Sequence, residues 1–115
     1  MHNIQQRAFE LEMNKAKEFY LLNQFENSFF HLERAHILGQ RSVTSHTISH
    51  YWMLKISLRN KDFREILGQL IRIPLGVFGS SLGIVPNGNT GRSNVGILQR
   101  MDIPKDLKEV MQKED

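Results

Sequence analysis

Histidine and glutamate residues in the middle of the chain have the spacing expected of metal ligands. Glu33 and His36 are three residues apart, and His46 and His50 are four residues apart. Residues separated by three or four positions share one face of a helix. Two such pairs on adjacent antiparallel helices would bring four metal-binding side chains to one place. The predicted ligands are therefore Glu33, His36, His46 and His50, with Glu65 as a candidate fifth ligand.

Imidazole and carboxylate groups together suit a divalent transition metal, most commonly zinc or iron. Di-iron helical bundles use two Glu-x-x-His copies and two further glutamates. This chain has one copy, so a mononuclear site is favoured, although Glu10 or Glu12 could add a carboxylate to a di-metal site. Ligation requires neutral imidazole, so metal affinity should fall as the pH drops through about 6.5. The alternative is that His36 is a hydrogen-bonded core residue and that His46 and His50 bind nothing.

Apolar residues recur with helical spacing over the first two thirds of the chain and predict an all-α protein. The pattern places four helices near residues 4–22, 24–38, 43–59 and 62–78, arranged as two antiparallel helical hairpins. Gly39 is expected to end the second helix in a left-handed conformation. Pro74 is expected to kink or stop the fourth helix near Ile73. Only about four residues link the second and third helices, which favours an antiparallel pair with both ligand pairs at the same end.

The composition changes after Gly79, where Gly, Ser and Asn become frequent and residues 86–91 (PNGNTG) predict consecutive turns. We expect this segment to cover the helices, because it carries apolar residues that need cover: Ile84, Val85, Val95, Ile97 and Leu98. A short last helix should follow Pro104. Residues 1–115 are then one helical domain, with a core at 1–79 and a covering loop and tail at 80–115.

The same loop, at residues 88–93, has a second interpretation as an anion-binding turn, because backbone N–H groups lie beside Arg92. A structural turn that covers the hairpins is the favoured interpretation. Glu65 and Gln69 are one helical turn apart, with Gly68 between them. The two side chains could contribute to the same pocket as the loop or form a solvated face. The small glycine suggests close approach of this helix to its neighbours and slightly favours the inward position.

The bulk composition excludes several classes of partner. The net charge of +3 is dispersed among nearly as many acidic residues, which argues against nucleic-acid binding. No apolar run approaches the roughly 20 residues that cross a bilayer, and no signal peptide is evident, so no membrane partner and a cytoplasmic location are expected. The absence of cysteine excludes thiolate ligands. One aromatic cluster exceeds what a small core readily buries and leaves a homodimer open: Phe25, Phe29, Phe30, Tyr51 and Trp52.

Four segments together resemble one small bacterial family that is known only as a domain of unknown function. They are residues 32–40 (LERAHILGQ), the His-x-x-x-His pair that follows, residues 64–69 (REILGQ) and residues 86–91 (PNGNTG). The resemblance implies a compact helical domain and carries no established activity. Residues 30–36 (FHLERAH) are also similar to the second helix of a tetratricopeptide repeat, a unit that normally recurs every 34 residues.

These observations support three functions in order of preference. The first is a small metal-binding helical protein with a His/Glu site between the second and third helices. The second is a tetratricopeptide-like protein-interaction module without metal. The third is a metal-dependent enzyme that uses a metal-bound water, since no Ser-His-acid spacing and no cysteine nucleophile is evident. Whether the protein is an enzyme is left open by the sequence.

Overall fold

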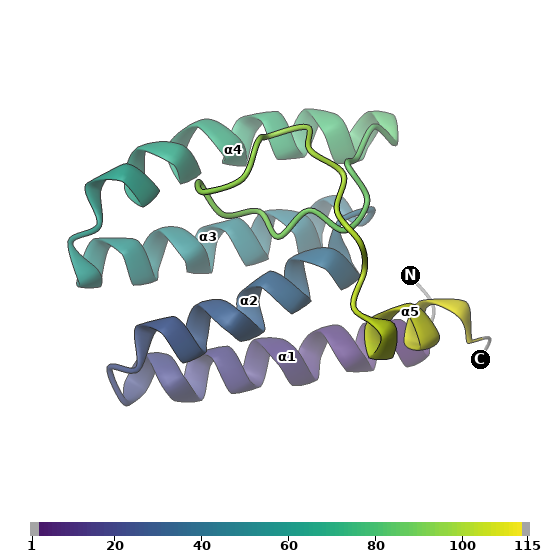
Figure 1. The fold of residues 1–115 in the computed structure, drawn as a ribbon, viewed down its shortest axis with the longest axis horizontal. Helices are drawn as coiled ribbons and strands as arrows, with labels where there is room; N and C mark the ends of the chain where they lie inside the picture. The colour runs from purple at the N-terminus through teal and green to yellow at the C-terminus, as the bar shows by residue number, and fades with distance from the viewer. Residues whose placement is uncertain (1–2, 114–115) are drawn as a thin grey trace.

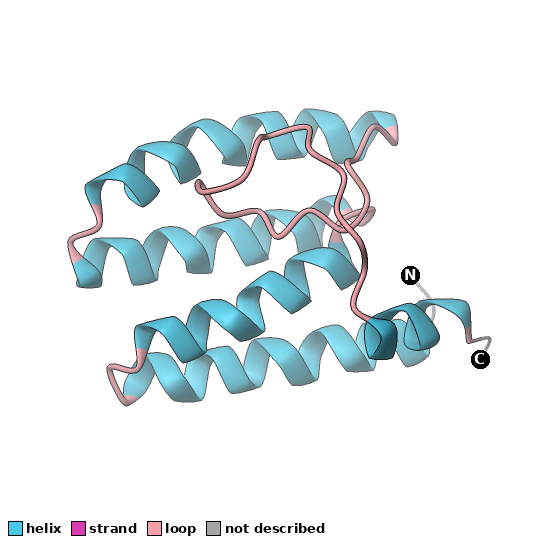
Figure 2. Cartoon of the chain, viewed as in Figure 1, coloured by secondary structure: helices cyan, strands magenta, loops and turns pink. Residues whose placement is uncertain are grey.

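A computed structural model describes residues 3–113, and within them the chain forms five α-helices and no strand (Figures 1 and 2). They are α1 (Asn3–Leu21), α2 (Phe25–Gly39), α3 (Val43–Asn60), α4 (Phe63–Leu82) and α5 (Lys105–Gln112). The predicted all-α class is confirmed. His2, for which the sequence suggested no role, lies outside the described residues.

The first four helices follow one another across the molecule in sequence order, each antiparallel to the one before (Figure 1). The hairpins α1–α2 and α3–α4 are the main packing units, and α2 also packs against α3. The helices α1 and α4 therefore lie at opposite edges of the array (Figure 1). The short α5 packs on α1 and α2.

The apolar core lies between α1, α2 and α3, with α5 at one end. Its buried side chains are Phe9, Met13 and Ala16 from α1, Phe29, Leu32, Ala35, Ile37 and Leu38 from α2, Met53 and Ile56 from α3, and Leu107 from α5. Among the described residues, α4 contributes none to this core. Its buried residues are Glu65, Gly68, Gln69 and Ser80. The fully buried positions of α4 are therefore polar side chains and one glycine, while Ile66, Ile73 and Val77 are partly buried.

The predicted left-handed end of α2 at Gly39 is wrong, because the residues described with a positive φ do not include it. Position 39 requires a glycine for a different reason. A Cβ atom at this position would lie 2.7 Å from Cβ of Ser45 and 3.0 Å from the ring of Phe9. The close approach of α1 and α3 at this point therefore requires glycine, and this approach sets where α3 starts relative to the end of α2.

Pro74 was expected either to kink the fourth helix or to stop it near Ile73. The stop near Ile73 is wrong. The helix α4 continues through Pro74 to Leu82. Proline removes only one backbone donor from the helix, and the turns that follow it remain hydrogen-bonded. Gly83 then terminates the helix with a left-handed φ of 73°, and its N–H bonds back to Gly79 and Ser80. The extra turn carries Ser80 to the candidate site.

The segment between α4 and α5 folds back over the helices as a loop (Figure 2), which confirms the expected cover. Its attachment is polar. Gln40 Nε2 donates to the carbonyl of Pro86 at 2.8 Å, and Gln69 Nε2 donates to the carbonyl of Gly91 at 2.9 Å. Within the loop, the buried Asn89 donates to the carbonyls of Gly96 and Gln99 at 2.9 and 2.8 Å. We expected burial of apolar residues to hold this loop against the helices. That expectation is wrong in large part, because three of the apolar residues on which it rested are exposed: Ile84, Ile97 and Leu98.

Within residues 3–113, none of the helices combines the length and the apolar character needed to cross a membrane.

Candidate metal centre

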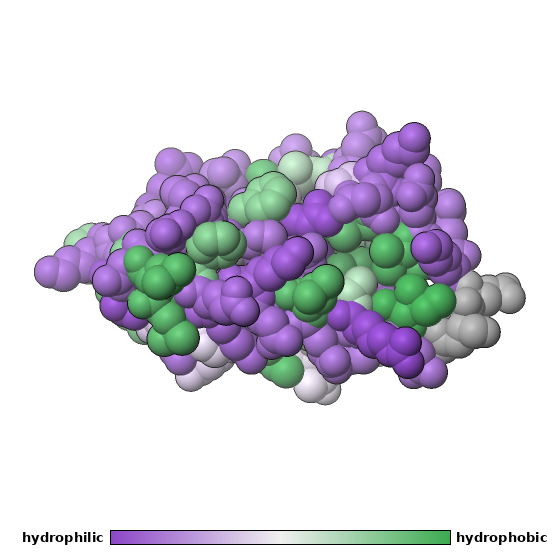
Figure 3. Space-filling view, turned by 90° about the horizontal axis from the view of Figure 1, so that it is seen from below, coloured by the Kyte–Doolittle hydropathy of each residue, from purple (hydrophilic) through white to green (hydrophobic). Residues whose placement is uncertain are grey.

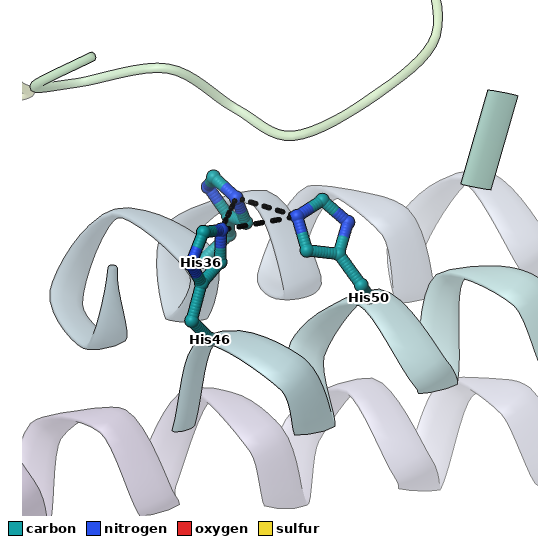
Figure 4. Close-up of side chains that lie close together, drawn as sticks. All are labelled: His36, His46 and His50. Carbon is teal, nitrogen blue, oxygen red and sulfur yellow. Dashed lines mark hydrogen bonds between the residues drawn. The ribbon is translucent and has the colours of Figure 1, made fainter. Parts of the chain in front are cut away.

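Three histidine side chains meet in the interior of the array. Nε2 of His36 lies 3.0 Å from Nε2 of His46 and 3.1 Å from Nε2 of His50, and the last two are 3.1 Å apart. The three rings point toward one another from α2 and α3 (Figure 4). Each residue is at most 5% exposed. Among the described residues, these three form the group of ligand-type side chains close enough to hold one metal ion.

Local sequence explains how the two helices bring the rings together. His36 lies in the last turn of α2, and a link of only three residues, 40–42, leads into α3. The side chain of Ser42 accepts a hydrogen bond from the N–H of Ser45 and so caps the start of α3. His46 follows in the first turns, and His50 lies one turn further on the same face. The predicted antiparallel link thus brings His36 to the level of the other pair.

The outer ring nitrogens of His36 and His50 each bond to an oxygen that only accepts. Nδ1 of His36 lies 2.7 Å from the backbone carbonyl oxygen of Asn89, so it carries the proton. Nδ1 of His50 lies 2.6 Å from the amide oxygen of Gln69. The amide orientation of Gln69 is set by its Nε2, which donates to Glu65 at 2.8 Å and to the carbonyl of Gly91 at 2.9 Å. Both histidines therefore present an unprotonated Nε2 to the centre.

The third histidine has the same arrangement through a serine. Nδ1 of His46 contacts the hydroxyl oxygen of Ser80, and that hydroxyl donates its proton to the backbone carbonyl of Gln40 at 3.1 Å. The hydroxyl oxygen is thus the acceptor for the Nδ1–H of His46. All three Nε2 atoms then face one another as acceptors, with no donor among the neutral rings. A cation between them satisfies all three lone pairs.

Burial keeps these rings neutral. Desolvation, followed by the charges of His50 and His46, lowers the pKa of His36 well below its usual value. Desolvation, followed by the charge of His50, lowers the pKa of His46 to about 4. The pKa of His50 is also lowered to about 4, mainly by desolvation, while the hydrogen bond to Gln69 acts in the opposite direction. At neutral pH the cluster is therefore a set of three uncharged nitrogen ligands.

Two glycines leave room for the rings. A Cβ atom at Gly91, whose φ is 85°, would lie 2.6 Å from Cδ2 of His36. A Cβ atom at Gly76 on α4 would lie 3.1 Å from Cε1 of His46. The covering loop and α4 therefore both approach the cluster through backbone, and larger side chains at these positions would displace the rings.

A cavity of about 410 Å³ opens beside the three histidines. Apolar side chains from α4 and the covering loop make up much of its lining: Leu75, Phe78, Leu82, Ile84, Ile97 and Leu98. Arg72 is the charged residue of the described lining, and its guanidinium donates to the carbonyl of Val95 at 2.7 Å. An ion held by the three rings can thus have a coordination position free toward a mostly apolar space.

Glu65, a predicted candidate ligand, lies outside the histidine cluster and supports it indirectly, through Gln69. Its carboxylate accepts hydrogen bonds from Gln69 at 2.8 Å, from the N–H and hydroxyl of Ser93 at 2.9 and 2.8 Å, and from Arg92 at 3.2 Å. Burial raises the pKa of Glu65, but these hydrogen bonds outweigh it and hold the pKa below its usual value. With its oxygens occupied, Glu65 orients Gln69 and, through Gln69, His50.

The other predicted carboxylates are also engaged elsewhere. Glu33 lies 3.8 Å from the guanidinium of Arg92, and it is not part of the histidine group. Because α2 turns Glu33 toward Arg92, only His36 of the predicted Glu-x-x-His pair reaches the centre. Glu12 is buried in a separate network, where it lies 2.7 Å from Nδ1 of His31 and 3.0 Å from Arg34. Arg92, the cation of the anion-binding interpretation of the loop, is paired with Glu26, Glu33 and Glu65 at 3.4, 3.8 and 3.2 Å.

Sequence reasoning placed Gln69 inward toward the loop, which is correct, and missed its contact with His50. It also missed Ser80 and Asn89, which bind the outer nitrogens of His46 and His36. Ser80 lies beyond residue 78, the predicted end of the fourth helix, in the segment predicted to be a loop. The Asn89 contact is made by its backbone carbonyl, which every residue has, so the residue type at this position does not predict the contact. The glycines of the PNGNTG segment were the available signal, since Gly91 marks a close approach of backbone.

A buried three-histidine cluster in an antiparallel helical array defines the class: a small all-α protein with a candidate metal centre. The chain belongs to the family described as protein of unknown function (DUF3703), whose model matches residues 3–111. This confirms the resemblance to an uncharacterised family. No curated protein and no solved structure matches the chain.

Proposed function

We propose that this protein binds one divalent transition-metal ion through Nε2 of His36, His46 and His50. The observation that supports this most strongly is the convergence of three unprotonated nitrogens whose opposite ring nitrogens are all held by oxygen acceptors. Metal-binding histidines usually donate their second ring N–H to such acceptors. A purely structural histidine cluster would instead pair a donor with an acceptor, because buried acceptors that face one another gain no hydrogen bond.

The dimensions of the triangle suit a metal ion. The three Nε2 atoms lie 3.0–3.1 Å from one another, so each of them could reach one shared ion at about 2.0–2.1 Å. Three imidazoles and no carboxylate favour zinc over non-haem iron, which commonly uses two histidines and one carboxylate. The guanidinium of Arg72 beside the cavity favours an anionic group as the further ligand, since three neutral imidazoles leave the ion's charge uncompensated.

The other two functions have less support. A tetratricopeptide-like module normally repeats its 34-residue unit several times, whereas this chain resembles the unit over residues 30–36 alone. An enzyme that uses a metal-bound water is compatible with the cavity beside the ion. However, the described lining of this cavity includes no carboxylate that could accept a proton. We therefore place metal binding before metal-dependent catalysis.

The test uses protein prepared without a histidine tag, stripped with a chelator and titrated with zinc, iron(II) or nickel in a calorimeter. The expected result is one ion per chain, with affinity for the preferred metal lowered at least about 100-fold by His36→Ala or His50→Ala. His31→Ala is the matched control, because His31 belongs to the Glu12 network. Undiminished metal binding in both His36→Ala and His50→Ala, with helicity retained, would refute the proposal.

A further inference from the structure

The outward face of α4 carries a continuous line of large apolar side chains. Seven of them recur along the whole helix with helical spacing and are between 46% and 77% exposed: Phe63, Leu67, Leu70, Ile71, Leu75, Phe78 and Leu82. We call this surface the α4 stripe. An ordinary edge helix turns such a stripe toward the core. Here the inward face is occupied by polar residues that serve the histidine cluster, so the stripe faces outward.

The opposite edge of the array looks different. Viewed from the side on which α1 lies, the surface is mainly hydrophilic, with apolar side chains in separate small groups (Figure 3). Contiguous exposed apolar surface is uncommon on monomeric proteins and marks an interaction site. The aromatic cluster that suggested a dimer from the sequence is a weaker candidate, because Phe29 is buried in the core. The unusual surface therefore lies on α4.

We propose that the α4 stripe binds the α4 stripe of a second copy of this chain, with the two helices antiparallel about a two-fold axis. The exposed parts of the seven side chains amount to about four whole side chains, or roughly 600–1,100 Å² at about 150–250 Å² for each large side chain. A standard stable interface buries about 800 Å² on each partner. One helix face thus provides the area that a two-fold dimer needs.

Charge distribution sets the direction of the pairing. The charged residues of α4 are Arg64, Glu65 and Arg72, all in its first half, and residues 73–82 carry no charge. A parallel pair would place Arg64 near Arg64 of the other copy. An antiparallel pair places Arg64 against the uncharged end of the other helix and avoids this repulsion. Arg72 lies near the midpoint of the helix, and its guanidinium is held by the carbonyl of Val95 on the covering loop.

The dimer would also enclose the cavity beside the histidines. Leu75, Phe78 and Leu82 belong to the α4 stripe and line the cavity as well. A second copy seated on the stripe therefore lies over part of the cavity's lining. The interface itself needs no metal, so the oligomeric state is measured both with a chelator and with zinc.

Sedimentation equilibrium of the full chain is the first test. We expect a dimer at about 100 μM and at least a tenfold weaker self-association for Leu67→Glu, which adds a charge within the stripe. Leu11→Glu is the control, because Leu11 is 55% exposed on α1, compared with 62% for Leu67. A monomer at this concentration, or equal effects of the two substitutions, overturns the proposal. Vesicle binding by a monomer also overturns it.

Crosslinking tests the direction of pairing, and the absence of cysteine from the sequence gives a clean background. A mixture of Phe63→Cys and Leu82→Cys chains treated with a short bismaleimide should yield the mixed crosslinked dimer. Each single variant alone should yield little. Efficient crosslinking of each variant with itself, and not with the other, would show parallel pairing and overturn the antiparallel arrangement.

Discussion

The amide oxygen of Gln69 accepts a hydrogen bond from Nδ1 of His50 at 2.6 Å, while the amide nitrogen donates to Glu65 and to the carbonyl of Gly91. One side chain on α4 therefore fixes the tautomer of a histidine on α3 and ties it to the covering loop. The preference for one tautomer directs the lone pair of His50 Nε2 to the centre of the cluster.

Replacement of this amide should weaken metal binding without removing a ligand. In Gln69→Leu, His50 loses the acceptor that holds its ring, and metal affinity should fall by about 10–100-fold. Gln40→Leu is the matched control, because Gln40 is also buried and donates to the same loop at Pro86. Calorimetric titration at a temperature at which both variants are folded provides the comparison. Equal losses in the two variants would contradict a specific role for Gln69.

Gly91→Ala should disturb His36 as well as the backbone. The added Cβ would lie 2.6 Å from the ring, and alanine is strained at a φ of 85°. Gly83 has a comparable φ of 73°, with no atom within 4 Å of a Cβ. Gly83→Ala should therefore cost about 1 kcal/mol of stability and leave metal affinity unchanged. Gly91→Ala should cost more in urea unfolding and should also weaken metal binding.

The stability of the metal-free protein should fall as the pH decreases from about 6.5 to about 4. The folded-state pKa values of His46 and His50 are lowered to about 4, whereas the unfolded values are about 6.5. Between these limits the unfolded chain binds more protons, so the free energy of unfolding decreases with decreasing pH. The loss should be about 3 kcal/mol for each of these two histidines.

Urea unfolding at several pH values in the presence of a chelator measures this loss. His46→Gln should reduce the slope between pH 6.5 and 4.5, since one titrating group is removed. For the same reason, proton competition with the metal should set in below the pH of about 6.5 that unperturbed histidines imply. A stability that stays constant down to pH 4.5 would contradict neutral burial of the cluster.

Glu33→Gln should leave metal affinity within about twofold of the unchanged protein, because Glu33 lies toward Arg92 and not toward the cluster. This outcome distinguishes the three-histidine set from the ligand set that spacing alone predicts. His50→Gln, measured beside it, should lose most of the affinity. A large loss in Glu33→Gln, with unchanged helicity, would restore the carboxylate to the metal centre.

The sequence by itself determined the helices and the meeting of the histidines. Periodic apolar residues and the caps at Ser42 and Asp62 depend on contacts within one or two turns, so local pattern reports them directly. The short link after α2 and the i, i+4 spacing of His46 and His50 then brought these two residues close to His36.

Only the tertiary structure decided which carboxylates stay away from the centre and which oxygens hold the outer ring nitrogens. Spacing made Glu33 a predicted ligand and left Glu65 as a candidate fifth, and in the structure both carboxylates contact Arg92 on the covering loop. Ser80, Gln69 and the carbonyl of Asn89 come from segments 19 to 53 residues distant from their histidines. The orientation of α4 was also undecided, because its stripe fits a core or a partner equally well until the neighbouring polar groups are placed.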